Sequence, residues 1–413
     1  MRDFTYFPQN LNVYARLAGP DRKLLPEYRQ NELNEKFDKI LFGPWDMSRT
    51  SIGKSEMLAP FSRARDYKAN GSPWQQSEWN AMRANANGAA YPSMAASAIT
   101  LRNTDLRELP THEPRYSEIT GNPRENPFDY FQQSLLPPGT PLLAAHKSQD
   151  GRWYYVECPI AGGWVDANDI ALVDASFRSE WRRGSYAALI KDKVVLPGTG
   201  TGKGDSLAGI GTILPLKKRH SNGRLDVLVP IARSQYAEVA EISLSSNEAR
   251  PKPMPLTPAN VALVGNQMIN QPYGWGGMLG ERDCSALTRD LFTPFGIWLP
   301  RNSVAQAKRG SIISLAGLSP QQKAETIMRN GTPFLSLVGM KGHITLYLGI
   351  WKGEPAIFHN VWGVRVIKNG NDDERFVIGK AVITSIAPGM ELENLYRTVT
   401  FTDRIRTLST PGN

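Results

Sequence analysis

Glycine and proline limit how much regular helix this chain can form. The 413 residues include 36 glycines and 30 prolines, and both residue types interrupt helices and mark turns. Their number indicates many turns and short strands rather than a helical bundle. Hydrophobic residues make up 41% of the chain, which is ordinary for globular protein, and the length allows two to four domains. We therefore expect an α+β protein with β-rich accessory domains.

The clearest domain boundary is a proline-rich run at 250–255. Its sequence, Arg-Pro-Lys-Pro-Met-Pro, cannot form a helix or a central strand, so we expect a stiff extended linker. Directly after it, Thr257 and Pro258 have the residue types of a helix cap and a first helical position. The last domain is expected to span 256–413.

Two β-rich segments and an N-terminal arm precede this boundary. Residues 98–178 contain short apolar runs separated by turns, a pattern that predicts a small barrel. Residues 179–255 repeat the pattern in a more divergent form and are expected to contain a second barrel and the linker. Residues 1–97 are expected to form a helical and extended arm, with amphipathic helices predicted around 33–41 and 77–83.

One of the two cysteines, Cys284, lies in the first turn of a predicted helix. Leu287 and Leu291 have helical spacing, and Asp283 can cap the run. The unpaired N–H groups at the start of a helix favour the thiolate form, which makes Cys284 a candidate nucleophile. A small buried hydrophobic residue is the alternative for Cys284 taken alone.

His343 and His359 are the two histidines that follow Cys284. Apolar and polar residues alternate from His343 onward, which predicts a half-buried strand, and a turn at 351–354 leads into a second short strand at 355–361. Antiparallel pairing would bring the two imidazoles together. We expect His343 to act as the base for Cys284 and His359 to orient it. A structural role in a β-layer is the alternative for either histidine alone.

A zinc site would be the competing use of Cys284, His343 and His359. The sequence has no Cys-x-x-Cys or His-Glu-x-x-His motif and no obvious fourth ligand. We therefore expect neither a metal nor another cofactor. The second cysteine, Cys158, follows a strand-like run, and we expect both cysteines to be free thiols, since a disulfide would consume the candidate nucleophile.

In order and type, these residues resemble the NlpC-type, papain-like cell-wall cysteine peptidases. Ala286 stands where a glycine is usual in that family, a small-for-small change. The matching segments, taken together and in this order, are more specific for the family than any one of them alone. The matching segments are Pro-Tyr-Gly-Trp-Gly-Gly at 272–277, Asp-Cys-Ser at 283–285, Leu-Pro-Arg-Asn-Ser at 299–303 with Gln306 after it, Gly-His at 342–343, and His359.

The resemblance implies hydrolysis of the γ-D-glutamyl–L-diamino acid bond of peptidoglycan stem peptides through an acyl-enzyme. The fold would be papain-like, with the helix that carries the cysteine packed on an antiparallel sheet, and the preceding barrels would be bacterial SH3-like domains. The catalytic residues would be Cys284, His343 and His359.

The resemblance also implies a site for the free amino group of the leading L-alanine. Asp283, Ser285 and Tyr273 would hold it, since an ammonium group needs carboxylate and hydroxyl acceptors. Taken without the resemblance, the same three residues would be a helix cap, an ordinary first-turn serine and a core aromatic.

Charge and hydropathy bound the partners and the location. Lysine and arginine exceed the acidic residues by nine, without a nucleic-acid motif, so we expect peptidoglycan-derived peptides rather than nucleic acid as partners. No apolar run is long enough to span a membrane, and residues 1–6 lack the apolar core of a signal peptide. We expect a periplasmic or cell-envelope protein if a signal peptide has been removed, and a cytoplasmic one otherwise.

Two further functions stay open at this point. One is a non-catalytic cell-envelope-binding protein whose peptidase domain is a relic. The other is a cysteine acyltransferase or amidase on the same scaffold, which would transfer the acyl group to an amine rather than to water.

Overall fold

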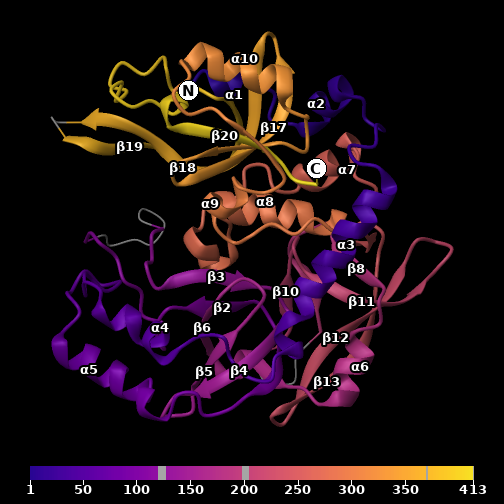
Figure 1. Ribbon diagram of the computed structural model, residues 1–413, viewed down its shortest axis with the longest axis vertical. Coiled ribbons are helices and arrows are strands. Elements are labelled where there is room, and N and C mark those ends of the chain that lie inside the picture. Colours follow the sequence, from indigo (N-terminus) through magenta and orange to yellow (C-terminus); the bar gives the residue numbers. More distant parts are fainter. Residues whose placement is uncertain (120–126, 198–203, 369–370, 413) are drawn as a thin grey trace. The chain divides into compact units, whose positions relative to one another are not determined.

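The computed structural model describes residues 1–119, 127–197, 204–368 and 371–412 (Figure 1). Contacts divide the chain into two compact units, which are described separately. Unit 1 comprises Met1–Glu35, Pro253–Tyr273 and Glu281–Asn413, and unit 2 comprises Lys36–Lys252 and Gly274–Gly280. Helix α3 (Glu27–Phe42) begins in unit 1 and ends in unit 2.

Unit 2 contains the predicted β-rich segments. Its strands pair in the order β14-β8-β11-β12-β13-β7-β1-β4-β5-β6-β2-β3, and β9 pairs with β10. The strands are β1 (Ala96–Thr100), β2 (Thr104–Arg107), β3 (Gln132–Leu136), β4 (Pro141–Lys147), β5 (Trp153–Glu157), β6 (Gly162–Asp166), β7 (Ile170–Leu172), β8 (Tyr186–Leu189), β9 (Val194–Leu196), β10 (Ser206–Ala208), β11 (Ile213–Arg219), β12 (Leu225–Arg233), β13 (Tyr236–Leu244) and β14 (Ala249–Lys252).

The strands predicted as two barrels form one continuous ladder. The link is a parallel contact between β7 and β13 at Leu172 and Tyr236. All other pairings in this ladder are antiparallel, as expected for strands joined by short turns.

Helices of the N-terminal arm cover part of this β-rich unit. The helices predicted around 33–41 and 77–83 are confirmed as α3 and α5, and Trp79 of α5 packs against Phe131 with the ring centroids 5.9 Å apart. The shorter helices are η1 (Gly43–Asp46), α4 (Lys54–Leu58), η2 (Ala59–Ser62), α5 (Gln76–Asn85), η3 (Gly88–Ala90), η4 (Ala167–Asp169), α6 (Ala175–Trp181) and η5 (Trp275–Gly280).

The predicted linker at 250–255 is partly wrong. Its first residues belong to strand β14, where Arg250 pairs with Ala188 and Pro251 with Ala187. The strand lies at the end of the sheet order, and an edge strand tolerates a proline because one side of its backbone needs no ladder partner. Within the predicted linker, the chain passes from unit 2 to unit 1 after Lys252.

Unit 1 is a six-stranded antiparallel sheet with helices packed on it. Within the described residues the strand order is β15-β20-β16-β17-β18-β19. The strands are β15 (Ser311–Ser314), β16 (Leu337–Met340), β17 (His343–Trp351), β18 (Glu354–Lys368), β19 (Asn371–Ser385) and β20 (Ile405–Thr410). The helices are α1 (Asp3–Tyr6), α2 (Leu11–Ala18), α7 (Pro258–Gly265), α8 (Cys284–Phe292), η6 (Thr293–Phe295), α9 (Ser303–Gln306), α10 (Pro320–Asn330) and η7 (Thr402–Arg404).

Helices α8 and α10 both pack on the sheet of unit 1. Helix α8 contacts β17 and β18, and α10 contacts β18; in Figure 1, α8 lies below these strands and α10 above them. Val338, Tyr347 and Ile357 are fully or almost fully buried in one apolar cluster with Ile327 of α10. The antiparallel sheet with a packed helix that begins at the cysteine matches the expected papain-like arrangement.

Candidate active site

Helix α8 begins at Cys284, as the sequence predicts. Asp283 is its cap, and its Oδ1 accepts a hydrogen bond from the Ala286 N–H at 2.8 Å. Cys284 is 7% exposed, and the backbone N–H groups of Ile344 and Ser285 act to lower the pKa of its thiol. Because Ile344 directly follows His343, the sulfur lies at the backbone next to the predicted base.

The predicted histidine hairpin is also present. Strands β17 and β18 pair in antiparallel fashion, with Leu346 opposite Phe358. Lys352 and Gly353 both have positive φ, at 47° and 86°, which is the backbone of a two-residue type I′ turn. This register brings the two histidines together, and His343 Nε2 lies 2.8 Å from His359 Nδ1.

A threonine extends this pair into a chain of three side chains. His359 Nε2 lies 3.0 Å from Thr384 Oγ1, which donates its proton to the Ser385 carbonyl at 2.8 Å. His359 and Thr384 are fully buried, and His343 is 7% exposed. Thr384 is on β19, a strand that the sequence did not predict.

The hydrogen-bond chain assigns the imidazole tautomers. Thr384 has a single proton, which it gives to Ser385, so it must accept one from His359 Nε2. The Nδ1 atom of a neutral His359 is then an acceptor, and His343 Nε2 must donate to it. This leaves the unprotonated nitrogen of His343 at Nδ1, where it can take a proton from a nucleophile.

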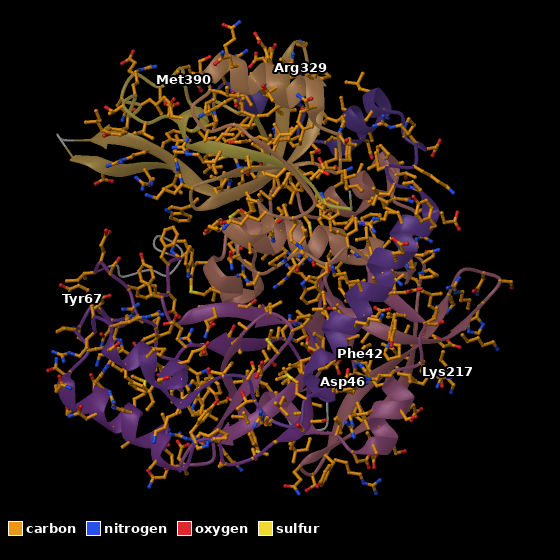
Figure 2. The ribbon with its side chains drawn as sticks, viewed as in Figure 1. Phe42, Asp46, Tyr67, Lys217, Arg329 and Met390 are labelled. Carbon is orange, nitrogen blue, oxygen red and sulfur yellow. The ribbon has the colours of Figure 1, made fainter. Side chains whose placement is uncertain are left out.

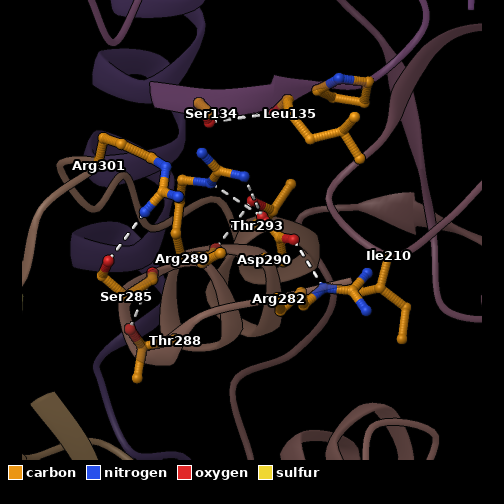
Figure 3. Close-up of polar contacts among 12 residues, drawn as sticks. Ser134, Leu135, Ile210, Arg282, Ser285, Thr288, Arg289, Asp290, Thr293 and Arg301 are labelled. Atoms are coloured by element: carbon orange, nitrogen blue, oxygen red, sulfur yellow. Dashed lines mark hydrogen bonds and ion pairs between the residues drawn. The ribbon is translucent and has the colours of Figure 1, made fainter. Parts of the chain in front are cut away.

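Asp283 and Ser285 form a tight group with an arginine that the sequence assigned no role. Arg301 Nη2 and Nη1 donate to the two carboxylate oxygens of Asp283 at 2.6 and 3.1 Å. Nη1 also donates to Ser285 Oγ at 2.9 Å (Figure 3). Ser285 Oγ donates to Asp283 Oδ1 at 3.0 Å. The side chains of Arg301 and Asp283 are 12% and 10% exposed, so this is a buried, bidentate ion pair.

The segment at 299–306, which follows helix α8 in the chain, forms hydrogen bonds to the first turn of that helix. Gln306 donates to the carbonyls of Ser285 and Pro300, each at 2.8 Å, and accepts a hydrogen bond from Thr288 at 2.6 Å. Gln306 is fully buried, so its amide ties the 299–306 segment to the first turn of α8.

Tyr273 completes the set of residues named from the sequence. Its pKa is raised well above the usual value, first by burial and then by the charges of Cys284 and Asp283. The hydroxyl therefore stays protonated and lies within electrostatic reach of both groups. Asn360 helps to hold the segments on either side of Tyr273 and Asp283 in place, because its amide donates to the carbonyls of Pro272 and Arg282 at 3.2 and 2.8 Å.

Burial keeps both candidate catalytic groups neutral in the free protein. It raises the pKa of the Cys284 thiol to about 12, with the Asp283 charge acting in the same direction, while the Ile344 N–H, the Arg301 charge and the Ser285 N–H act against it. Burial, together with the charge of Arg404, lowers the pKa of His343 to about 3. The resting thiolate expected from the helix start is therefore wrong, because desolvation exceeds the effect of the helix N–H groups.

Phe401 packs on both histidines. Its ring centroid is 5.7 Å from that of His343 and 5.6 Å from that of His359, in edge-to-face geometry. Phe401 is 9% exposed, so it shields the imidazoles from water and contributes to the desolvation that lowers their pKa values.

Among the described residues, no group of three or more histidine, cysteine or acidic side chains has an arrangement that could hold a metal. Cys158 and Cys284 are both free, as predicted. Within the same part of the chain, no helix is long and apolar enough to cross a membrane.

The fold and this cysteine–histidine arrangement define a papain-like protein with SH3-type and N-terminal helical additions. Three family models match the chain: an NLPC_P60 stabilising domain at 1–91, an SH3 domain of the SH3b1 type at 114–166, and the NlpC/P60 family at 270–376. The chain thus carries an NlpC/P60 domain preceded by an SH3 domain and a stabilising domain.

Known proteins with similar sequence or structure carry endopeptidase names. A probable endopeptidase from Corynebacterium glutamicum (strain R) is 32% identical over 130 residues, which are 30% of this chain and 59% of that protein. A second strain of the species has a probable endopeptidase that is 31% identical over 128 residues. The matched stretch thus spans 59% of the length of these relatives.

A solved structure covers nearly the whole chain. It is an NlpC/P60 endopeptidase from Photobacterium damselae subsp. piscicida, with a TM-score of 0.84 and 26% sequence identity over 98% of this chain and 97% of that one. The likeness extends over both units of the chain.

Proposed function

We propose that this protein is a cysteine peptidase that hydrolyses the γ-D-glutamyl–L-diamino acid bond of peptidoglycan stem peptides. The observation that carries the proposal is the chain from His343 through His359 to Thr384, which leaves a basic nitrogen on His343. The next residue, Ile344, has a backbone N–H that favours the Cys284 thiolate. We also propose that the protein acts in the periplasm or cell envelope if a signal peptide has been removed from it, and in the cytoplasm otherwise.

The proposed reaction starts from a neutral pair. When a substrate carbonyl reaches the site, the Cys284 proton moves to His343 Nδ1 and the sulfur attacks the γ-carbonyl carbon. Backbone N–H groups at the start of α8, including that of Cys284, hold the oxyanion. The amide C–N bond then breaks, the leaving amine takes the proton from His343, and a thioester remains on Cys284. Water, activated by His343, hydrolyses this thioester.

We further propose that Asp283, Ser285 and Tyr273 bind the free amino group of the leading L-alanine. Arg301 already donates to both of the first two residues, so an ammonium group bound there would share these acceptors with the guanidinium. N-acetylation of the peptide tests this role separately. Equal cleavage of acetylated and free peptide would remove the amine-binding role and leave the peptidase proposal standing.

The experiment that tests the proposed function is hydrolysis of L-Ala-γ-D-Glu-meso-diaminopimelate by the wild type and by Cys284→Ala. We expect diaminopimelate release by the wild type and none by the variant, with Cys158→Ala as the matched control that keeps activity. Release by Cys284→Ala at the wild-type rate would overturn the proposal.

The alternative is a cell-envelope-binding protein with a relic domain. The observation in its favour is the high pKa of the buried Cys284 thiol. Binding of the peptide without release of diaminopimelate by the wild type would support this alternative.

A further inference from the structure

Arg404 is held beside the histidine pair by the turn that precedes His343. Its Nη2 donates to the Lys341 carbonyl at 2.6 Å, and the Lys341 N–H donates to the Arg404 carbonyl at 3.3 Å. Lys341 and Gly342 connect β16 to β17, which begins at His343. Three residues before Arg404, Phe401 packs on both imidazoles. Arg404 is therefore attached by its guanidinium and by its backbone to the turn that precedes His343.

Two more arginines contribute positive charge to this position. Arg365 of β18 lies directly opposite Arg375 of β19, a cross-strand pair of like charges that is unfavourable by itself. The Arg365 guanidinium stacks on the Tyr396 ring at 4.2 Å. In Figure 1, β18 and β19 run side by side as a long hairpin that extends beyond the rest of the sheet of unit 1.

The charges of these arginines act on one another and on the nucleophile. Burial lowers the pKa of Arg404, and the charges of Arg375 and Arg365 lower it further, whereas the negative charge of a Cys284 thiolate raises it. The side chain of Asp403, the residue directly before Arg404, accepts hydrogen bonds from the N–H and hydroxyl of Thr400 at 2.8 and 2.6 Å. A negative charge close to Cys284 thus stabilises the charged form of Arg404.

We propose that Arg404, supported by Arg365 and Arg375, binds a carboxylate of the substrate next to the scissile bond. A guanidinium matches a carboxylate with two parallel N–H donors, and partial burial strengthens the pairing. This inference rests on the proposed function, since a stem peptide carries such carboxylates on either side of the bond: the α-carboxylate of the D-glutamyl residue and a carboxylate of the diamino acid. Both sources present the same chemistry to Arg404.

The test uses three forms of L-Ala-γ-D-Glu-meso-diaminopimelate: the free acid, the form amidated at the D-glutamyl α-carboxylate, and the form amidated at both diaminopimelate carboxylates. The values of kcat/KM are measured for the wild type and Arg404→Gln. We expect the variant to lose roughly 10- to 100-fold on the free acid, as for a lost hydrogen-bonded charge pair. Against the amide that removes the bound carboxylate, wild type and variant should be equally slow, and this identifies the carboxylate.

Arg329→Gln is the matched control, because Arg329 is an exposed arginine on α10 of the same unit (Figure 2). It should leave all three activities unchanged. Arg404→Lys keeps the positive charge but loses the two parallel N–H donors. Its decrease in kcat/KM on the free acid should therefore be smaller than that of Arg404→Gln. An unchanged acid-to-amide preference in Arg404→Gln would overturn the inference, as would a wild type that cleaves all forms equally.

A binding measurement separates this inference from the peptidase proposal. Calorimetric titration of the free acid and the amides into Cys284→Ala, with and without Arg404→Gln, does not require turnover. A preference for the free acid that disappears with Arg404→Gln supports the carboxylate site even where the wild type releases no product. Equal affinity for acid and amides in both proteins refutes it even where hydrolysis is observed.

Discussion

Removal of Arg301 should destabilise the candidate active site in a pH-dependent way. Arg301→Met leaves the Asp283 carboxylate buried beside Cys284 without its bidentate partner. Breaking a buried ion pair by deleting one partner costs about 3–5 kcal/mol. We expect a loss of about this size in the free energy of unfolding at pH 8.

The pH dependence follows from two opposing effects on Asp283. Burial alone would raise its pKa, but the charge and hydrogen bonds of Arg301 lower it below the usual value. In the wild type, the resulting stability is present above the unfolded pKa of about 4 and is lost as the pH falls through the lower folded value. In Arg301→Met, only the hydrogen bonds from the Ala286 N–H and the Ser285 hydroxyl still oppose burial, so the folded pKa rises and the carboxylate becomes protonated at higher pH. The cost of the substitution should therefore shrink as the pH falls from 8 to 5.

Urea unfolding at pH 8 and pH 5 measures this difference for the wild type, Arg301→Met, Asp283→Asn and the double variant. The double variant should lose less than Arg301→Met alone at pH 8, because it leaves no buried charge. The reasoning is refuted if Arg301→Met costs the same at both pH values, or if the double variant loses the sum of the two single losses.

Three further variants or conditions test the protonation states. Thr384→Val should reduce kcat/KM about tenfold with a smaller effect on KM, because His359 loses the acceptor that fixes its tautomer; an unchanged kcat would contradict this. In free Cys158→Ala protein, alkylation of Cys284 by iodoacetamide should be slow at pH 7 and rise about tenfold per pH unit up to pH 10, since its thiol is protonated below a pKa of about 12; a plateau below pH 8 would disprove it. Phe401→Ala should admit water to His343 and raise its pKa from about 3 towards 6.5, so activity should fall below about pH 6 where the wild type stays active; identical pH profiles would exclude this shielding role.

Local sequence patterns predicted the parts of the site that depend on neighbouring residues. The cap Asp283 and the spacing of Leu287 and Leu291 predicted helix α8. Alternation after His343 predicted strand β17, but its half-buried character is wrong, because residues 343–349 are all buried. Both features have a fixed period that can be counted along the chain. The hairpin then required only a short turn to bring His343 and His359 together.

The residues that were missed depend on contacts between distant segments. Thr384 reaches His359 because β19 pairs with β18, and Phe401 reaches the histidines from the segment before β20. Arg301 lay in a segment matched to the family, but a polar residue 17 positions after Cys284 carries no local sign that its guanidinium pairs with Asp283. The neutral state of Cys284 was missed for the same reason, because burial depends on the whole domain.

The most direct test of the account is the mass of the protein during turnover. Wild-type protein mixed with excess L-Ala-γ-D-Glu-meso-diaminopimelate and quenched with acid within milliseconds to seconds should carry an L-Ala-γ-D-Glu acyl group, located by peptide mapping on Cys284. The group should be absent from Cys284→Ala. Release of diaminopimelate by the wild type with no acyl group on Cys284 at any quench time would contradict attack by this sulfur.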